Sequence, residues 1–204
     1  MEKIKSTMPN ILLSLTTICL ISGVALAMAN KYTAYPIAAT KAAELHSAIQ
    51  NVTPAFDNNP ASEMFKVAIA GVSDSLTVYP AKKDGKLVGC AVESYSKKGF
   101  CGLIRVLAGF DAEGKLYNYS VLEQNETPGL GTKMEEWFRT NKNRQNIIGR
   151  DMTKGTLKLK KDGGDIDTIT AATISARAFL EAINLAYNAF IENAGVTDNA
   201  LETK

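Results

Sequence analysis

Apolar residues at the start of the chain form one long run that no charge interrupts. The run extends from Ser6 to Asn30, which is 25 residues between Lys5 and Lys31. A helix needs about 20 apolar residues to cross the hydrocarbon core of a membrane, so this segment is long enough to span one. We interpret residues 1–31 as an uncleaved anchor, because the uncharged run is longer than the core of a typical signal peptide. A cleaved signal peptide stays the alternative, since "ALAMA" offers small residues for cleavage.

After this run, apolar residues recur at helical spacing. Ala42, Leu45 and Ile49 lie three or four residues apart, which predicts a helix within Thr33 to Pro54. The "AFDNNPAS" that follows is rich in turn-forming residues. We therefore expect residues 32–60 to connect the anchor to a separate domain.

The pattern changes to that of short strands between Leu76 and Val121. "DGKLVGCAV" and "EGKLYNYSV" are alike, and each places an acidic residue and a glycine before a strand. Such dipeptides after an apolar stretch are typical of hairpin turns. The apolar segment Gly102 to Asp111 supplies the strand that leads into the second turn. The pattern predicts an antiparallel meander.

The last third of the chain mixes helical and irregular patterns. Met134 to Asn141 is a short helical candidate, and alternation from Thr156 to Leu159 predicts a strand before a turn at Gly163-Gly164. A final helix is predicted from about Ile174 to Asn193, ended by Gly195. Its predicted apolar face consists of Phe179, Ile183, Ala186, Phe190 and Ile191.

Taken together, these elements predict an α+β fold. A single N-terminal transmembrane helix is followed by a domain at residues 61–195, with an antiparallel or mixed sheet and flanking helices. Residues 196–204 are expected to form a flexible tail. The rest of the chain offers no second span, so the domain is expected to lie wholly on one side of the membrane.

Charge and residue counts remove several classes of function. With 23 basic and 21 acidic residues the net charge is +2, which gives no electrostatic reason to expect nucleic acid as a partner. The one histidine, His46, is too few for a catalytic triad or a His-based metal site. Cys90 and Cys101 have no metal-binding spacing; they would be able to pair in an extracytoplasmic domain, but we favour two free thiols.

The first motif that suggests chemistry is "ETPGLG", Glu126 to Gly131. Pro128-Gly129 favours a type II turn, with the glycine taking the positive φ. Gly131 allows the backbone to approach another group closely. One carboxylate without a partner does not specify acid–base chemistry. From these residues alone, a tight loop between a strand and a helix is the preferred interpretation.

The second motif, "DTITAATISARAF", places four hydroxyl residues just before the final helix. A helix cap, which is worth about 1 kcal/mol, explains one of them, either Thr173 or Ser175. The alternative is an anion site, because the unpaired N–H groups at a helix start favour phosphate. Small residues at Ala171 and Ala172 would let a phosphate approach the backbone, and Thr170 and Ser175 would donate hydrogen bonds to it.

These residues resemble a known family. "Asp167-x-x-Thr170-Ala171-Ala172-Thr173" is similar to the D-x-x-[ST]-G-A-T flavinylation motif, whose last threonine carries FMN through a phosphoester that a flavin transferase makes from FAD. "ETPGLG" is similar to the same family's second signature. "YSKKGFCGLIRVLAGFDAEGKL" and "VTPAFDN" resemble two further segments of it. The family includes the G subunit of the Rnf ion-translocating electron transport complex and the C subunit of the sodium-pumping NADH:quinone reductase. The overall length favours the G subunit, because the C subunit is typically longer.

The resemblance implies covalent FMN on Thr173 and a role for Asp167 as a recognition signal for the transferase. Thr127, Pro128 and Leu130 are expected to form one wall of the ring pocket, and Glu126 either holds the loop or lies near a ring edge. Lys133 is expected to favour a reduced anionic flavin. The expected cofactor-binding set is Thr173, Thr170, Ala172, Ser175, Glu126, Thr127, Pro128, Gly129, Leu130, Gly131 and Lys133, with no catalytic residue and no metal ligand.

The implied function is electron transfer within an Rnf-type complex that couples ferredoxin and NAD redox chemistry to ion movement, with no independent catalysis. Implied partners are iron–sulfur and flavin subunits, the membrane and, during maturation, the flavin transferase. The domain is expected on the extracytoplasmic, periplasmic side of a bacterial inner membrane. A flavin-containing sensor, a part of a quinone reductase and a purely structural domain are the alternatives.

The chain departs from the family pattern at two positions. Ala171 replaces the usual glycine, which strains the backbone if this position requires a positive φ. Gln124 stands where many members have a histidine, so a histidine-dependent proton role near the flavin has no carrier here.

Overall fold

The computed structural model describes residues 7–69, 71–72 and 74–201, which form an α+β fold as predicted. The long helices are α1 (Met8–Val52) and α3 (Thr173–Leu201). The strands are β1 (Phe65–Val67), β2 (Leu76–Lys83), β3 (Lys86–Gly99), β4 (Gly102–Asp111) and β5 (Leu116–Gln124). Four short helical segments lie between β5 and α3, namely η1 (Gly131–Lys133), α2 (Met134–Trp137), η2 (Met152–Lys154) and η3 (Lys160–Asp162).

Helix α1 is continuous through the predicted anchor and the predicted connecting helix. Its segment Met8–Thr33, with 26 residues and a mean hydropathy of 2.3, is the one stretch among the described residues that is long and apolar enough to cross a membrane. The chain divides into two compact units between Leu45 and His46. The last turns of α1 therefore belong to the same unit as the sheet.

The five strands form one antiparallel sheet in the order β1-β2-β3-β4-β5, which confirms the predicted meander. Asp84 and Gly85 join β2 to β3 and both have positive φ, at 51° and 73°. Positive φ at both central residues is the requirement of a type I′ hairpin turn, which Asp-Gly favours. Between β4 and β5 the connection is longer, and Gly114 is the one residue in it with a positive φ, at 81°.

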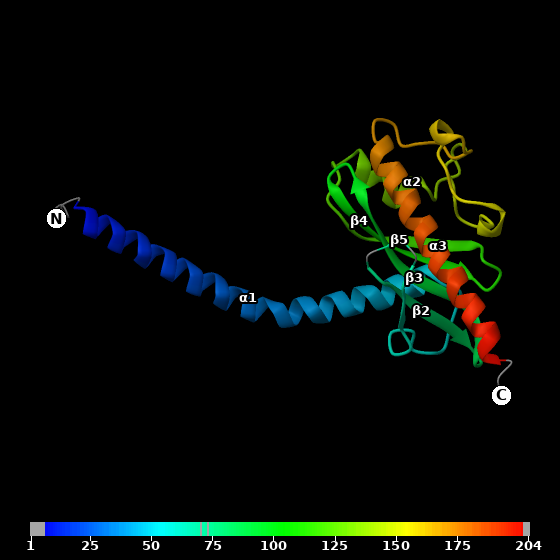
Figure 1. Cartoon of the computed structure of the whole chain (residues 1–204), viewed down its shortest axis with the longest axis horizontal. Coiled ribbons are helices and arrows are strands. Elements are labelled where there is room, and N and C mark those ends of the chain that lie inside the picture. Colours follow the sequence, from blue (N-terminus) through cyan, green and yellow to red (C-terminus); the bar gives the residue numbers. More distant parts are fainter. Residues whose placement is uncertain (1–6, 70, 73, 202–204) are drawn as a thin grey trace. The chain divides into compact units, whose positions relative to one another are not determined.

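Helix α3 covers one face of this sheet, and Figure 1 shows it in orange and red across the green strands. The contact includes several aromatic pairs. Phe110 on β4 lies 5.5 Å from the ring of Tyr187, and Tyr119 on β5 lies 4.9 Å from Phe179 in an edge-to-face arrangement. Offset and edge-to-face rings add stability beyond the apolar area they bury, so this layer fixes the position of α3 along the sheet.

The last turns of α1 pack on the face of the sheet that α3 does not cover. Ile49 and Val52 are fully buried there, and the side-chain amide of Asn118 on β5 donates to the Asn51 carbonyl at 2.9 Å. A Cβ on Gly109 would lie 1.7 Å from the Val52 carbonyl oxygen. Only glycine permits the helix backbone to approach the strand this closely.

The strand predicted at Thr156 to Leu159 is wrong, because this segment forms no strand. The backbone of Leu157 instead forms hydrogen bonds with the side chain of Asn184 on α3. The Asn184 amide oxygen accepts from the Leu157 N–H at 2.8 Å, and the Asn184 amide nitrogen donates to the Leu157 carbonyl at 2.9 Å. Leu157 and Leu159 are both buried. Alternation here reflects two leucines that face the core from an irregular segment.

Two details of the final helix also differ from the prediction. Ile191 is 48% exposed, because it lies one position and about 100° around the helix from the buried Phe190. The helix does not end at Gly195 but continues to Leu201, since one glycine costs only about 1 kcal/mol inside a helix. The predicted flexible tail is thus helical as far as Leu201, and residues 202–204 lie outside the described part.

The cysteines are free, as favoured from the sequence. Cys90 is buried within β3, and burial raises the pKa of its thiol to about 12. Cys101 is exposed in the turn between β3 and β4.

Candidate functional site

The two sequence motifs meet in one cavity at the start of α3. We call this cavity, of about 350 Å³, the attachment cavity. Its lining consists of Glu126, Thr127, Leu130 and Gly131 from the first motif, Ala171, Ala172, Thr173, Ile174 and Ser175 from the second, and Phe100 from the turn between β3 and β4. Gly131 and Ala171, the nearest lining residues of the two motifs, are 40 residues apart in the chain, so distant segments form a single site.

The first motif forms the turn that its Pro-Gly pair predicts. Gly129 has φ 74°, and the Leu130 N–H donates to the Thr127 carbonyl at 3.1 Å. The Gly129 N–H donates to the hydroxyl of Thr132 at 3.0 Å. The backbone N–H groups at the tip of the loop therefore have hydrogen-bond partners within the loop, and these bonds hold its shape without a ligand.

Glu126 ties together the three segments that line the cavity. Its carboxylate is buried, and it accepts hydrogen bonds from the Ser175 hydroxyl at 2.5 Å and from the Cys101 N–H at 3.0 Å. Its own N–H donates to the side-chain oxygen of Gln124 at 2.8 Å. Of the two roles expected for Glu126, the geometry supports the one that holds the loop, and Gln124 helps to orient it.

Gly131 permits this close assembly. A Cβ at this position would lie 2.6 Å from the Glu126 Cβ and 2.8 Å from the Ser175 Oγ. Such distances are shorter than van der Waals contact, so a side chain there would force the loop away from α3. The close approach predicted for Gly131 is therefore confirmed, and the group that approaches is the Glu126–Ser175 pair.

Thr173 is the first residue of α3 and is partly exposed at the edge of the cavity. Its hydroxyl lies 3.4 Å from the Nζ of Lys161, which is positioned to donate to it. The first N–H groups of a helix have no partner within the helix, and the helix dipole adds a partial positive charge at this end. The surroundings of the Thr173 hydroxyl therefore favour a bound anion.

Ala171, just before the helix, has φ 62°. This is the left-handed region, where a Cβ costs roughly 1–2 kcal/mol and glycine costs nothing. The position therefore requires the conformation that glycine provides, and alanine adopts it under strain. The surrounding turn still forms, since the Ala172 N–H donates to the Ile169 carbonyl at 3.1 Å.

Asp167 lies outside the cavity lining and anchors the start of the second motif. Its carboxylate pairs with the Lys160 Nζ at 2.6 Å and accepts from the Arg144 N–H at 3.0 Å. These two contacts hold the pKa of Asp167 below its usual value. Its carbonyl accepts from the Trp137 indole at 3.1 Å, which links the motif to α2.

Several predicted residues do not line the cavity. Thr170, Pro128 and Gly129 are exposed outside its lining, and Lys133 lines a different hollow beside Trp137. The Ser175 hydroxyl donates to Glu126 in this structure, and its expected donation to a phosphate stays a prediction. These differences follow from the direction of each side chain, which loop sequence alone does not fix.

The structure adds three residues that the sequence argument did not assign to the site. Phe100 is 67% exposed and Ile174 is 47% exposed, and both face the cavity together with Leu130, which is 37% exposed. Lys161 is the third, through its approach to Thr173. For Phe100 a signal existed, since it lies in a segment that resembles the family. No pattern in the neighbouring sequence indicated that Lys161 belongs to the site.

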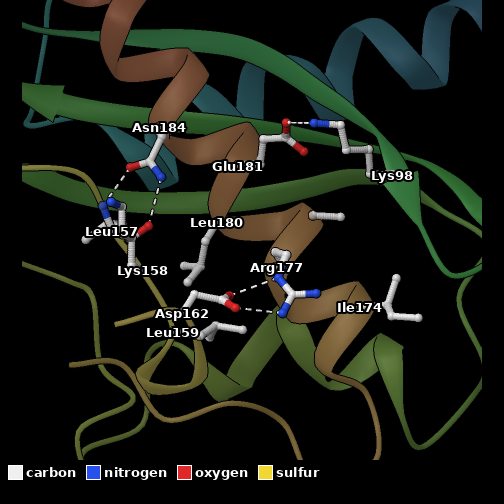
Figure 2. Close-up of a pocket in the computed structure, with 11 residues that line it drawn as sticks. Lys98, Leu157, Lys158, Leu159, Asp162, Ile174, Arg177, Leu180, Glu181 and Asn184 are labelled. Carbon is white, nitrogen blue, oxygen red and sulfur yellow. Dashed lines mark hydrogen bonds and ion pairs between the residues drawn. The ribbon is translucent and has the colours of Figure 1, made fainter. Parts of the chain in front are cut away.

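A second hollow, of about 460 Å³, lies against the first turns of the same helix, and we call it the side groove. Figure 2 shows that its polar side chains point toward one another. It is lined by Lys98, Leu157, Lys158, Leu159, Asp162, Ile174, Arg177, Ala178, Leu180, Glu181 and Asn184. Arg177 makes two hydrogen bonds with Asp162, at 2.7 and 2.9 Å, and Lys98 pairs with Glu181 at 2.5 Å.

The model of the FMN-binding domain family matches residues 99–188, which contain every residue of the attachment cavity. Among curated relatives, a protein of Shewanella amazonensis is 33% identical over 189 residues, covering 88% of this chain and 86% of that protein. A protein of Photorhabdus laumondii is 33% identical over 77% of this chain and 78% of its own length. One of Cereibacter sphaeroides is 33% identical, with 81% and 76% covered.

Each of these relatives is named as the G subunit of an ion-translocating oxidoreductase complex. Their similarity covers more than three quarters of both chains in each comparison. The chain belongs to the G-subunit family of ion-translocating oxidoreductase complexes and contains its FMN-binding domain.

Proposed function

We propose that this chain is the electron-carrying subunit of an ion-translocating oxidoreductase complex, with FMN bound covalently to Thr173. Membership in the G-subunit family and the FMN-binding domain support a membrane flavoprotein subunit. The observation that carries the covalent part is the meeting of both motifs in one cavity, with the Thr173 hydroxyl at its edge.

The residues present fit an FMN molecule. The helix start and Lys161 provide positive potential beside Thr173, where the phosphate would lie. Phe100, Leu130 and Ile174 provide exposed apolar surface next to it, which suits a flat aromatic ring. When bound, FMN supplies one- and two-electron transfer, and the chain's part is to hold and tune it.

Thr173 lacks a base within its own segment, and a hydroxyl without a base is a poor nucleophile. An external flavin transferase resolves this. In that reaction the Thr173 Oγ1 forms a bond to the FMN phosphorus of FAD, the phosphoanhydride bond to AMP breaks, AMP leaves, and the hydroxyl proton passes to a base of the transferase. Asp167, fixed by Lys160 and exposed enough to be reached, would be the recognition signal.

The remaining assignments follow from the family. The chain is a single-pass membrane protein by its apolar helix and the names of its relatives. We place its FMN domain on the extracytoplasmic, periplasmic side, where a covalent tether prevents loss of a cofactor that is not available for rebinding. Its neighbours would be the iron–sulfur and flavin subunits that supply and accept electrons during ferredoxin and NAD redox chemistry coupled to ion movement.

The test is coexpression of the full chain with a flavin transferase, followed by a denaturing gel viewed under ultraviolet light. A fluorescent band is expected for the natural sequence and for Thr168→Ala, because Thr168 occupies an unconstrained position of the motif and does not line the cavity. No band is expected for Thr173→Ala. A band that persists in Thr173→Ala contradicts the attachment site, and no band in the natural sequence contradicts the covalent flavin. Copurification with other redox subunits then tests the carrier role against a sensor.

A further inference from the structure

The short helix η3 contacts the attachment segment through consecutive side chains. Lys160 pairs with Asp167 at 2.6 Å, ahead of α3. Asp162 accepts two hydrogen bonds from Arg177 within α3, as Figure 2 shows. The side chain between them, Lys161, approaches Thr173. One short helix therefore faces the segment before the attachment residue, that residue itself, and the turn after it.

Backbone bonds hold η3 in this place. The Lys160 N–H donates to the Ile166 carbonyl at 2.9 Å, and the Ile166 N–H donates to the Lys158 carbonyl at 3.2 Å. Gly163 ends η3 with φ 82°, and its N–H donates to the Lys160 carbonyl at 3.2 Å. The position of Lys161 beside Thr173 is thus set by the fold and does not depend on one exposed ion pair.

Lys161 differs from Lys160 and Asp162 because its partner is uncharged. Lys160 and Asp162 each form an ion pair with a side chain of opposite charge. Within the described residues, no carboxylate lies at ion-pairing distance from Lys161, and its contact is the neutral hydroxyl of Thr173, 3.4 Å away. A lysine that stays unpaired next to a hydroxyl is placed to meet a negative charge on that hydroxyl.

We propose that Lys161 is the counter-cation of the phosphodiester on Thr173, an inference that rests on the proposed function. A phosphoryl group on the Thr173 Oγ1 places its negative charge one bond from an atom that the Lys161 Nζ already approaches. Lysine binds phosphate as a point charge, and a charge-assisted hydrogen bond is about twice as strong as a neutral one. Lys161 and the helix start would together neutralise the linkage, which favours a phosphate-linked flavin over an uncharged one.

The test compares the full chain before and after flavinylation in detergent. The variants are Lys161→Gln, Lys161→Arg and, as a matched control, Lys158→Gln. Lys158 is exposed, carries the same charge and lies three residues away, but it lines the side groove and not the attachment cavity. Two quantities are measured: the ³¹P resonance of the linkage, and the change in thermal unfolding midpoint that flavinylation causes.

In the natural sequence and in Lys158→Gln, flavinylation is expected to raise the midpoint by the same amount. In Lys161→Gln most of that increase is lost and the ³¹P resonance shifts, whereas Lys161→Arg keeps both near the natural values because it keeps the charge. With limiting transferase, Lys161→Gln is also expected to label about tenfold more slowly.

Equal midpoint changes and equal ³¹P resonances in Lys161→Gln and the natural sequence overturn the inference, as does an equal loss in Lys158→Gln. If Lys161→Gln is not labelled at all, Lys161→Arg decides: labelling supports the need for a cation, and failure to label overturns it. These outcomes are distinct from failure of the proposed function, in which the natural sequence itself is not labelled or Thr173→Ala still is.

Discussion

Two hollows flank the first turns of α3, and they differ in how their polar groups are used. The side groove is the larger, at about 460 Å³ against about 350 Å³, yet all of its charged lining side chains except Lys158 are paired with one another. Arg177 binds Asp162, and Lys98 binds Glu181. The attachment cavity instead borders helix N–H groups that no helical partner satisfies.

Strain and exposed apolar surface separate the two hollows further. The attachment cavity contains Ala171 in a left-handed conformation, and two large, exposed apolar side chains, Phe100 and Leu130, line it and not the side groove. Such features lower the stability of the isolated chain, and they accumulate where a ligand or partner later compensates for them. Unused donors and local strain therefore mark a functional hollow better than its size does.

The largest effect is expected at Glu126, whose removal should open the attachment cavity. In Glu126→Ala the buried Ser175 hydroxyl and the Cys101 N–H lose their acceptor, which should lower the free energy of unfolding by roughly 2–4 kcal/mol. Denaturant titration of the full chain in detergent measures this. Glu123→Ala is the control, since Glu123 is about half exposed and its removal should cost about 0.5 kcal/mol or less. Equal losses in the two variants would remove Glu126 from its central role.

A smaller effect, of opposite sign, is expected from relief of strain at Ala171. Ala171→Gly should raise the free energy of unfolding by about 0.5–1 kcal/mol, because glycine adopts φ 62° without a clash. Ala178→Gly, inside the helix that follows, should lower it by at least about 1 kcal/mol, because a buried methyl group is lost as well. Both variants should still be flavinylated. A loss of stability in Ala171→Gly would mean that the left-handed turn is not strained.

The smallest effect is expected in the side groove. Lys98→Gln removes the exposed ion pair with Glu181 and should change the free energy of unfolding by no more than about 0.5 kcal/mol. Flavin labelling and the flavin absorption spectrum should not change. A shifted spectrum would show that the flavin reaches the side groove, and the distinction between the two hollows would then be wrong.

Local patterns predicted much of the fold correctly. The Asp-Gly and Glu-Gly dipeptides predicted both hairpins, because Asp84, Gly85 and Gly114 adopt the positive φ that their turns need. The alternation at Thr156 to Leu159 predicted a strand that does not form. Two buried leucines at i and i+2 also occur in an irregular segment, here one whose backbone is hydrogen-bonded to a side chain of α3. Local sequence also did not predict that α3 continues through Gly195, because one glycine lowers helix stability only slightly.

The sequence by itself determined the apolar helix, the order of the strands and the presence of two motifs, since each depends on neighbouring residues and on backbone preferences. Only the tertiary structure decided that Glu126 and Ser175, 49 residues apart, share a hydrogen bond, and that Phe100 and Lys161 join them around Thr173. Those contacts arise when α3 packs across the sheet and brings distant loops to one end of the helix. Packing of aromatic side chains sets that placement, and no local pattern in either motif encodes it.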